Sequence, residues 1–173
     1  MARFTVRRIF LLLLFIGAAV FGAACEQSLV SKPSQPVDDF AEVITPPYEK
    51  RISSLARELF TKTGVELVLV TLSDLAGADP KEYAHRLYNE RGLGKTGEDR
   101  GVLILVSVRE RKMRIRTGTG LKAILPPRQI GEIQDRFAAP LLKQNNYDDG
   151  LLNGVVAVAK IIAKQSGVTL KEP

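Results

Sequence analysis

Two predominantly apolar runs, separated by an amphipathic segment, constrain the fold of this chain more than any other feature. The runs cover residues 65–72 and 101–108, and each has the length and composition of a strand buried on both faces. Residues 79–92 lie between them and show helical spacing, with Tyr83 and Leu87 on one face. A strand, a helix and a second strand form the crossover that places two strands parallel in one sheet.

Further helices and one more strand complete the predicted domain. Helical spacing recurs over residues 46–64, 127–142 and 147–164. Residues 112–117 alternate between basic and apolar side chains after a polar reversal, which predicts a half-buried strand that runs antiparallel to its predecessor. We therefore predict the α/β class: a three-layer α/β/α sandwich with a small mixed, mostly parallel sheet of three to four strands.

The basic row on this last predicted strand has two interpretations. Lys112, Arg114 and Arg116 occupy alternate positions, so they share one face of the strand. The row protects an edge strand from aggregation by its charge, or it forms a patch for acidic partners or lipid head groups. Both interpretations stay open at this stage.

The N-terminus has the layout of a secretory signal peptide. Arg3, Arg7 and Arg8 precede an apolar run over residues 9–20, and small residues follow at positions 22–24. The run is shorter than the roughly 20 residues that a membrane span needs. These arginines account for half of the formal charge of +6, so the charge of the remaining chain does not indicate a nucleic-acid-binding protein. We predict a signal peptide over residues 1–24 and an exported mature chain.

Cys25 follows this segment and is the single cysteine of the chain. The sequence Gly-Ala-Ala-Cys resembles a bacterial lipobox, which predicts lipidation of Cys25 and attachment to the outer face of a bacterial membrane; the alternative is ordinary cleavage near Ala24, which gives a soluble periplasmic protein. We assign residues 25–36, polar and with two prolines, to the lipidated cysteine and a flexible tether. The folded domain then covers residues 37–167, and residues 168–173 are expected to form a loose tail.

Several segments, taken in order, resemble the TPM domain family. They are residues 37–41 (VDDFA), 65–72, 83–94 (YAHRLYNERGLG), 97–104 (GEDRGVLI), 114–121 (RIRTGTGL) and 140–150. The resemblance implies an extracytoplasmic α/β/α sandwich that in some members binds a divalent cation through aspartates. Some plant members of this family have been assigned acid phosphatase activity, and others are accessory proteins of membrane complexes.

The strand order brings one carboxylate close to a glycine-rich turn. Asp99 precedes the second parallel strand, and Gly118, Thr119 and Gly120 follow the antiparallel strand, so both lie at the same end of the sheet. Glycines allow backbone amides to approach a ligand closely, and a carboxylate is a suitable ligand for Ca²⁺ or Mg²⁺. The turn is therefore our candidate ligand loop.

The resemblance adds two aspartates to this candidate site. Asp39 matches the N-terminal aspartate of the family and Asp135 an acidic position in its penultimate helix, so Asp39, Asp99 and Asp135 form the predicted site for Ca²⁺ or Mg²⁺. The structural alternative is that Asp39 caps a turn, Asp99 shapes its loop and Asp135 is a solvated helix residue. The strand order itself does not place Asp39 beside Asp99. The helix that follows Asp39 runs antiparallel to the first parallel strand, so it starts at the opposite end of the sheet from Asp99.

Two functions of different classes follow. The first is a membrane-tethered interaction module that assists the assembly, repair or quality control of envelope complexes, with membrane proteins as partners. The second is a weak metal-assisted acid phosphatase, in which an ion polarises a phosphoryl oxygen. We favour the first, because no general acid or base other than carboxylates is evident in the sequence.

Overall fold

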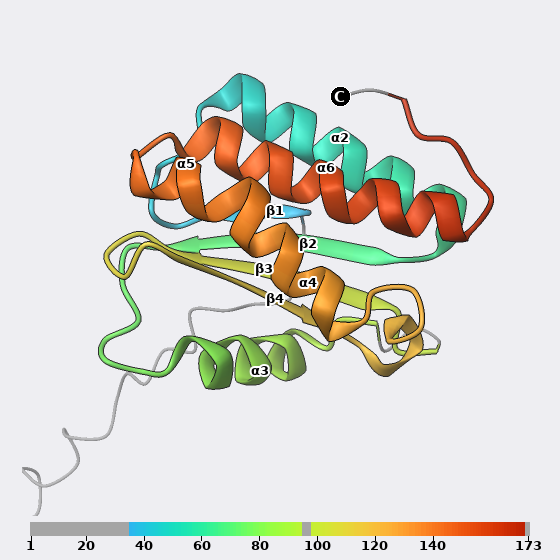
Figure 1. The fold of residues 1–173 in the computed structure, drawn as a ribbon, viewed down its shortest axis with the longest axis horizontal. Coiled ribbons are helices and arrows are strands. Elements are labelled where there is room, and N and C mark those ends of the chain that lie inside the picture. Colours follow the sequence, from blue (N-terminus) through green and yellow to red (C-terminus); the bar gives the residue numbers. More distant parts are fainter. Residues whose placement is uncertain (1–34, 95–97, 172–173) are drawn as a thin grey trace, which may run out of the picture.

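A computed structural model describes residues 35–94 and 98–171 of the chain. A mixed four-stranded sheet in the order β1-β2-β3-β4 lies at its centre, with helices on both faces (Figure 1). The strands are β1 (Val37–Asp39), β2 (Glu66–Leu72), β3 (Gly101–Ser107) and β4 (Lys112–Thr117). The predicted α/β/α sandwich is confirmed.

The pairing of the strands decides which loops meet at each end of the sheet. β1 runs parallel to β2, with Asp39 opposite Thr71, and β2 runs parallel to β3, with Glu66 opposite Gly101. β4 returns antiparallel to β3. The start of β3 and the finish of β4 therefore lie at one end of the sheet, and the finish of β1 lies at the other.

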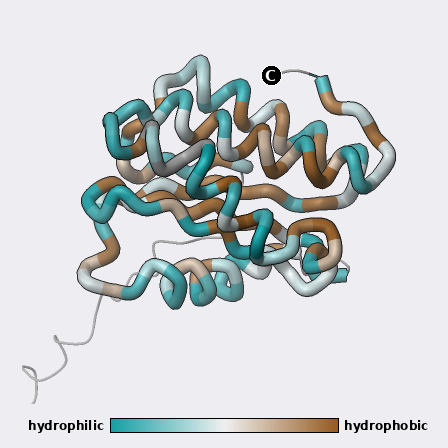
Figure 2. The backbone as a smooth tube through the Cα atoms, viewed as in Figure 1, coloured by the Kyte–Doolittle hydropathy of each residue, from teal (hydrophilic) through white to brown (hydrophobic). Residues whose placement is uncertain are grey.

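The helices divide unequally between the two faces. Helix α3 (Pro80–Arg91) covers one face, while α2 (Pro46–Thr63) and α6 (Tyr147–Gln165) lie side by side over the other (Figure 1). The second face also carries η1 (Thr119–Leu121), α4 (Pro127–Ile133), the π-helical turn η2 (Gln134–Ala138) and α5 (Ala139–Lys143). The hydrophobic residues gather along the strands and the inner sides of the helices (Figure 2).

Two hydrophobic cores follow from this arrangement. The larger core lies between the sheet and α2 and α6, and the smaller core lies under α3. The parallel strands supply both, because their alternate side chains point to opposite faces: Leu69 and Ile104 enter the larger core, and Val70 and Leu105 the smaller one. This explains why apolar residues occupy consecutive positions over most of both predicted strands.

Two helix boundaries follow directly from capping signals. Helix α2 begins with prolines at its first positions and ends at Gly64, whose φ of 70° is in the left-handed region. Helix α3 begins after Asp79, whose side chain accepts hydrogen bonds from the backbone N–H groups of Lys81 and Glu82, and it ends at Gly92. These boundaries agree with the predicted ones.

The C-terminal half differs from the predictions in two details. The helix expected over residues 127–142 is helical throughout, as α4, η2 and α5, but its middle forms a π-helical turn, because Pro140 lacks the N–H that a regular α-helix requires and its ring crowds the preceding turn. The expected loose tail instead lies against α2 up to residue 171: Lys62 Nζ donates to the carbonyl of Thr169 at 2.8 Å, and Lys171 N donates to Glu58 Oε1 at 3.1 Å.

The predicted signal peptide, Cys25 and all but the last two residues of the predicted tether lie outside the described residues. Over the residues that are described, none of the helices combines the length and the apolar character that crossing a bilayer requires.

Candidate functional site

Asp99 lies in contact with the glycine-rich turn that follows β4. Its Oδ2 accepts hydrogen bonds from the backbone N–H of Thr119 at 2.6 Å and from the Thr119 hydroxyl at 2.9 Å. Its Oδ1 accepts one from the Tyr88 hydroxyl at 2.7 Å. One carboxylate thus joins α3, the loop before β3 and the turn after β4. The structure brings Asp99 and residues 118–120 together, and ligand binding there stays a prediction.

The glycines of this region make the close contact with Asp99 possible. A Cβ atom on Gly118 would lie 1.9 Å from the Asp99 carbonyl oxygen and 2.5 Å from the Tyr88 hydroxyl. A Cβ atom on Gly120 would lie 2.1 Å from the Glu98 carbonyl oxygen. At these two positions glycine is therefore required by the close approach of the chain's own loop.

The charge state of Asp99 follows from these hydrogen bonds. The backbone N–H of Thr119 and then the Tyr88 hydroxyl lower the pKa of the Asp99 carboxyl, with a smaller contribution from the positive charge of Arg116. Burial, followed by the hydrogen bond to Asp99, raises the pKa of Tyr88. The guanidinium of Arg116 lies 5.6 Å from the centre of the Tyr88 ring. Asp99 is therefore ionised and Tyr88 protonated at neutral pH.

Asp39 lies at the opposite end of the sheet and has its own internal partners. Its Oδ1 accepts a hydrogen bond from the hydroxyl of Thr71, which is fully buried, and its Oδ2 accepts one from Ile44 N at 2.8 Å. The Thr71 hydroxyl in turn accepts from Ala41 N at 3.2 Å. Asp39 therefore holds the loop between β1 and α2 against β2.

Two further aspartates join the N-termini of α2 and α6 at this same end. Asp148 accepts hydrogen bonds from Thr45 N and the Thr45 hydroxyl, both at 2.8 Å, and Asp149 accepts one from the Tyr48 hydroxyl at 2.9 Å. Hydrogen bonds from Asn146 and Tyr48 lower the pKa of Asp149. This pair of aspartates therefore cross-links the starts of two helices.

The structure does not bring the three predicted ion ligands together. Asp39 pairs with Thr71, whereas Asp99 precedes Gly101, which pairs with Glu66; the five-residue step from Glu66 to Thr71 spans roughly 16 Å. Ca²⁺ ligands lie about 2.3–2.6 Å from the ion, so Asp39 and Asp99 cannot share one.

Asp135 is separate from both. Its side chain is exposed on η2. The neighbouring residue Gln134 donates a hydrogen bond to the carbonyl of Met113, which lies near the start of β4, whereas Thr119 follows the end of β4. Over residues 35–94 and 98–171, no three His, Cys, Asp or Glu side chains lie close enough to hold a metal ion. The described residues therefore do not bring Asp39, Asp99 and Asp135 together, and binding of Ca²⁺ or Mg²⁺ stays a prediction.

Sequence reasoning missed two residues that this geometry makes important. Tyr88 lies on the predicted helix over residues 79–92, and its hydroxyl is a partner of Asp99. Arg91, near the end of α3, is 3% exposed and forms a salt bridge with Asp38 of β1. No local pattern marks either contact, since both cross from a helix to another part of the fold.

The comparisons with known proteins agree with this fold. Residues 37–161 match the TPM domain family. The N-terminal domain of a protein from P. gingivalis, determined in solution by NMR, is 24% identical, with a TM-score of 0.73 over 80% of this chain and 88% of that domain. No curated protein matches the chain.

Two more solved structures share the fold. The N-terminal domain of the cg2496 protein from Corynebacterium glutamicum is 16% identical, with a TM-score of 0.59 over 81% of this chain and 86% of that one. The BA42 protein from Bizionia argentinensis is 22% identical, with a TM-score of 0.62 over 72% of this chain and 85% of that one. Identities this low establish the fold alone, whereas the family match covers most of the sequence. The chain belongs to the TPM domain family.

Proposed function

We propose that this protein is an exported, membrane-tethered interaction module that assists the assembly, repair or quality control of envelope complexes. The observation that carries the proposal is the state of Asp99, the carboxylate that sequence reasoning placed at the centre of the candidate site. Its two oxygens accept three hydrogen bonds from within the domain. A carboxylate engaged in this way stabilises the shape of a surface rather than reacting with a substrate.

The charge state of Asp99 supports the same proposal. A general acid or base works best when its pKa lies near the working pH, and the hydrogen bonds from Thr119 and Tyr88 lower the pKa of Asp99 away from neutrality. Asp39 is also engaged, by Thr71 and Ile44. Membership of the TPM family is compatible with binding roles, since one fold supports several functions.

The location in this proposal comes from the N-terminal sequence. The basic residues, the apolar run and Cys25 predict export followed by lipid attachment. In a bacterial host, we expect the full-length protein to fractionate with membranes and to be cleaved by protease added to spheroplasts. Cys25→Ser should release it into the soluble periplasmic fraction. Protection from external protease would contradict export, and membrane retention of Cys25→Ser would contradict lipidation.

The role itself needs a separate test. In the source bacterium, deletion of the gene should alter the abundance or size of at least one envelope complex on native gels, and the wild-type gene should restore it. The Asp99→Asn gene should restore it less well, because the hydrogen bonds of Asp99 hold the loop before β3 and the turn after β4 in place. A deletion strain with unchanged envelope complexes under growth and stress conditions would contradict the proposal.

Phosphatase turnover distinguishes the alternative function. The purified protein should release no phosphate from p-nitrophenyl phosphate above the rate of Asp99→Asn, at acidic or neutral pH and with Ca²⁺ or Mg²⁺. Turnover that is abolished in Asp99→Asn but retained in Asp135→Asn, with both variants folded, would favour the enzyme.

A further inference from the structure

One end of the domain combines basic side chains with exposed apolar surface. It is formed by the last turns of α2 and α6 and by residues 168–171, which bond to α2 through Lys62 and Glu58. We call it the helix-end surface and define it by Arg57, Phe60, Lys62, Lys160, Lys164 and Lys171. Both helices run toward this end, because their N-termini are joined at the other end of the domain.

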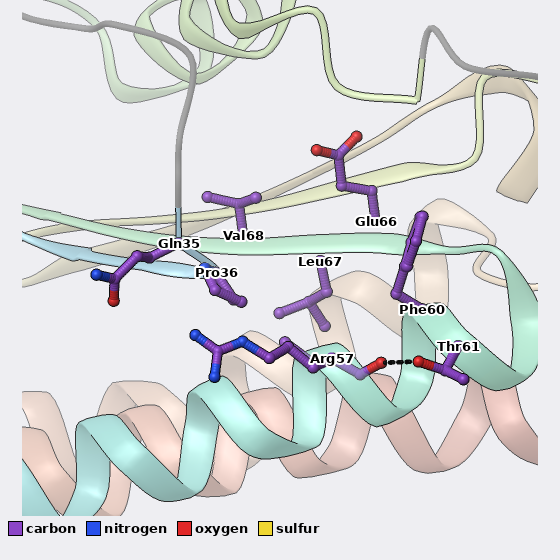
Figure 3. A pocket seen from close by; sticks show the side chains of 9 residues that line it. Gln35, Pro36, Arg57, Phe60, Thr61, Glu66, Leu67 and Val68 are labelled. Atoms are coloured by element: carbon purple, nitrogen blue, oxygen red, sulfur yellow. Dashed lines mark hydrogen bonds between the residues drawn. The ribbon is translucent and has the colours of Figure 1, made fainter.

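Two apolar grooves open on this surface. The first, of about 430 Å³, lies between α2 and β2 and is lined in part by Arg57, Phe60 and Leu67 (Figure 3). The second, of about 330 Å³, lies between α2, α6 and the C-terminal segment, and Lys160, Lys164 and Lys171 contribute to its lining together with Leu55, Val156, Ala163, Val168 and Leu170. Apolar surface beside long basic side chains is typical of a membrane interface, where lysine stems lie along apolar groups and the charged ends stay in water.

The carboxylates close to this surface have partners within the domain. Glu58 forms a salt bridge with Lys62 at 2.7 Å and accepts hydrogen bonds from Lys171 N. Glu66, in the first groove, accepts a hydrogen bond from Gly94 N at 3.1 Å. Among the residues that the structure describes, five basic side chains face these two carboxylates, so this part of the helix-end surface is positively charged and complementary to anionic lipid.

The chain enters the described fold beside this surface. Gln35 lines the first groove together with Arg57 and Phe60, and its side chain is drawn close to Pro36 in Figure 3. The segment that carries the predicted lipid anchor therefore joins the domain here. The ten residues from Cys25 to Gln35 span at most about 35 Å. An anchored domain is thus held close to the bilayer, with this surface near the point of attachment.

We propose that the helix-end surface docks on an anionic lipid bilayer and fixes the orientation of the domain on the membrane. The inference rests on the membrane attachment in the proposed function and adds the face that meets the lipid. Docking presents the opposite end of the domain, with Asp39 and Phe40, to partners. Each basic residue close to an anionic surface favours docking by about fivefold.

Lysine modification measures this orientation on the full-length protein. The protein is reconstituted into vesicles of phosphatidylcholine alone or with about one third phosphatidylglycerol, floated on a density gradient, and reductively methylated for analysis by mass spectrometry. On the anionic vesicles, Lys160, Lys164 and Lys171 should react at least about fivefold more slowly than on the neutral ones. Lys143, which lies on α5 before α6 begins, should react equally on both.

Matched variants separate docking from other effects. Phe60→Ser and Arg57→Glu should each restore fast modification of the three lysines. Phe40→Ser is the control for Phe60→Ser, because both phenylalanines are 51% exposed and Phe40 lies at the opposite end. Arg109→Glu, in the exposed loop after β3, is the control for Arg57→Glu. Neither control should change the modification rates.

The outcomes distinguish docking from attachment. A protein that floats and shows equal lysine rates on both kinds of vesicle would overturn the docking surface and leave the attachment intact. A protein that does not float with either kind of vesicle would overturn both. Protection that Phe40→Ser abolishes as strongly as Phe60→Ser would show that the protection does not depend on the helix-end surface and would refute the inference.

Discussion

Replacing Asp99 by Asn tests whether the hydrogen bonds of this carboxylate hold α3, the loop before β3 and the turn after β4 together. We call this arrangement the Asp99 clasp. Asn keeps one acceptor oxygen but places an NH₂ group where the second oxygen was, so the donors of Tyr88 and Thr119 no longer all have an acceptor. The backbone is retained, because Asn tolerates the φ of 54° at this position as well as Asp does. The substitution therefore isolates the side-chain contribution.

The expected size of the effect follows from the three hydrogen bonds. A hydrogen bond to a charged group contributes roughly 1.5–3 kcal/mol, and water compensates part of this loss because Asp99 is partly exposed. We expect the free energy of unfolding to fall by about 1.5 kcal/mol in urea titrations followed by circular dichroism. The melting temperature should fall by roughly 5 °C.

The difference between wild type and Asp99→Asn should depend on pH. Hydrogen bonds lower the pKa of Asp99 in the folded state below its unfolded value of about 3.9. Its contribution to stability is therefore complete above the unfolded pKa, and it is lost as the pH falls through the lower folded pKa. The two unfolding curves should differ most at neutral pH and converge at acidic pH.

A double-mutant cycle with Tyr88→Phe completes the test. The two substitutions should be less than additive, with a coupling energy of about 0.5–1 kcal/mol, because each removes the same hydrogen bond. Additive effects, or a stability of Asp99→Asn within about 0.3 kcal/mol of wild type at neutral pH, would refute the clasp.

Three further predictions concern stability measured in the same way. Gly118→Ala should lower the free energy of unfolding by at least about 3 kcal/mol, because the new Cβ atom would overlap the Asp99 loop. Gly131→Ala should raise it by about 0.5–1 kcal/mol, because Gly131 lies within helix α4 and the new Cβ atom would meet no neighbouring atom. Asp38→Ala should cost about 3 kcal/mol by leaving the buried Arg91 guanidinium unpaired; Arg91→Met should cost less than half as much, because the Asp38 side chain is 22% exposed and water can solvate it. Asp135→Asn should leave the urea midpoint unchanged, because the side chain is exposed. Equal losses for the two glycine variants, or a larger loss for Arg91→Met than for Asp38→Ala, would contradict the packing described here.

The sequence by itself determined the class and most elements of this fold. Helix α3 could be placed from Asp79 and Gly92, because capping and left-handed glycine conformations depend on neighbouring residues. The predominantly apolar runs of β2 and β3 predicted two parallel strands buried on both faces. The contact between Asp99 and the turn at residue 119 also followed from strand order alone.

Only the tertiary structure decided which aspartates lie close together and which groups of the domain form hydrogen bonds or salt bridges with them. Asp39 could not be placed from the sequence, because a three-residue strand has too little periodicity to predict its pairing with β2. The hydrogen bond from Tyr88 to Asp99 joins a helix to the loop before β3, and the salt bridge between Arg91 and Asp38 joins that helix to a strand far away in the sequence. Local propensity and spacing describe each segment alone, whereas such contacts exist only after the sheet order has set which ends of the segments meet.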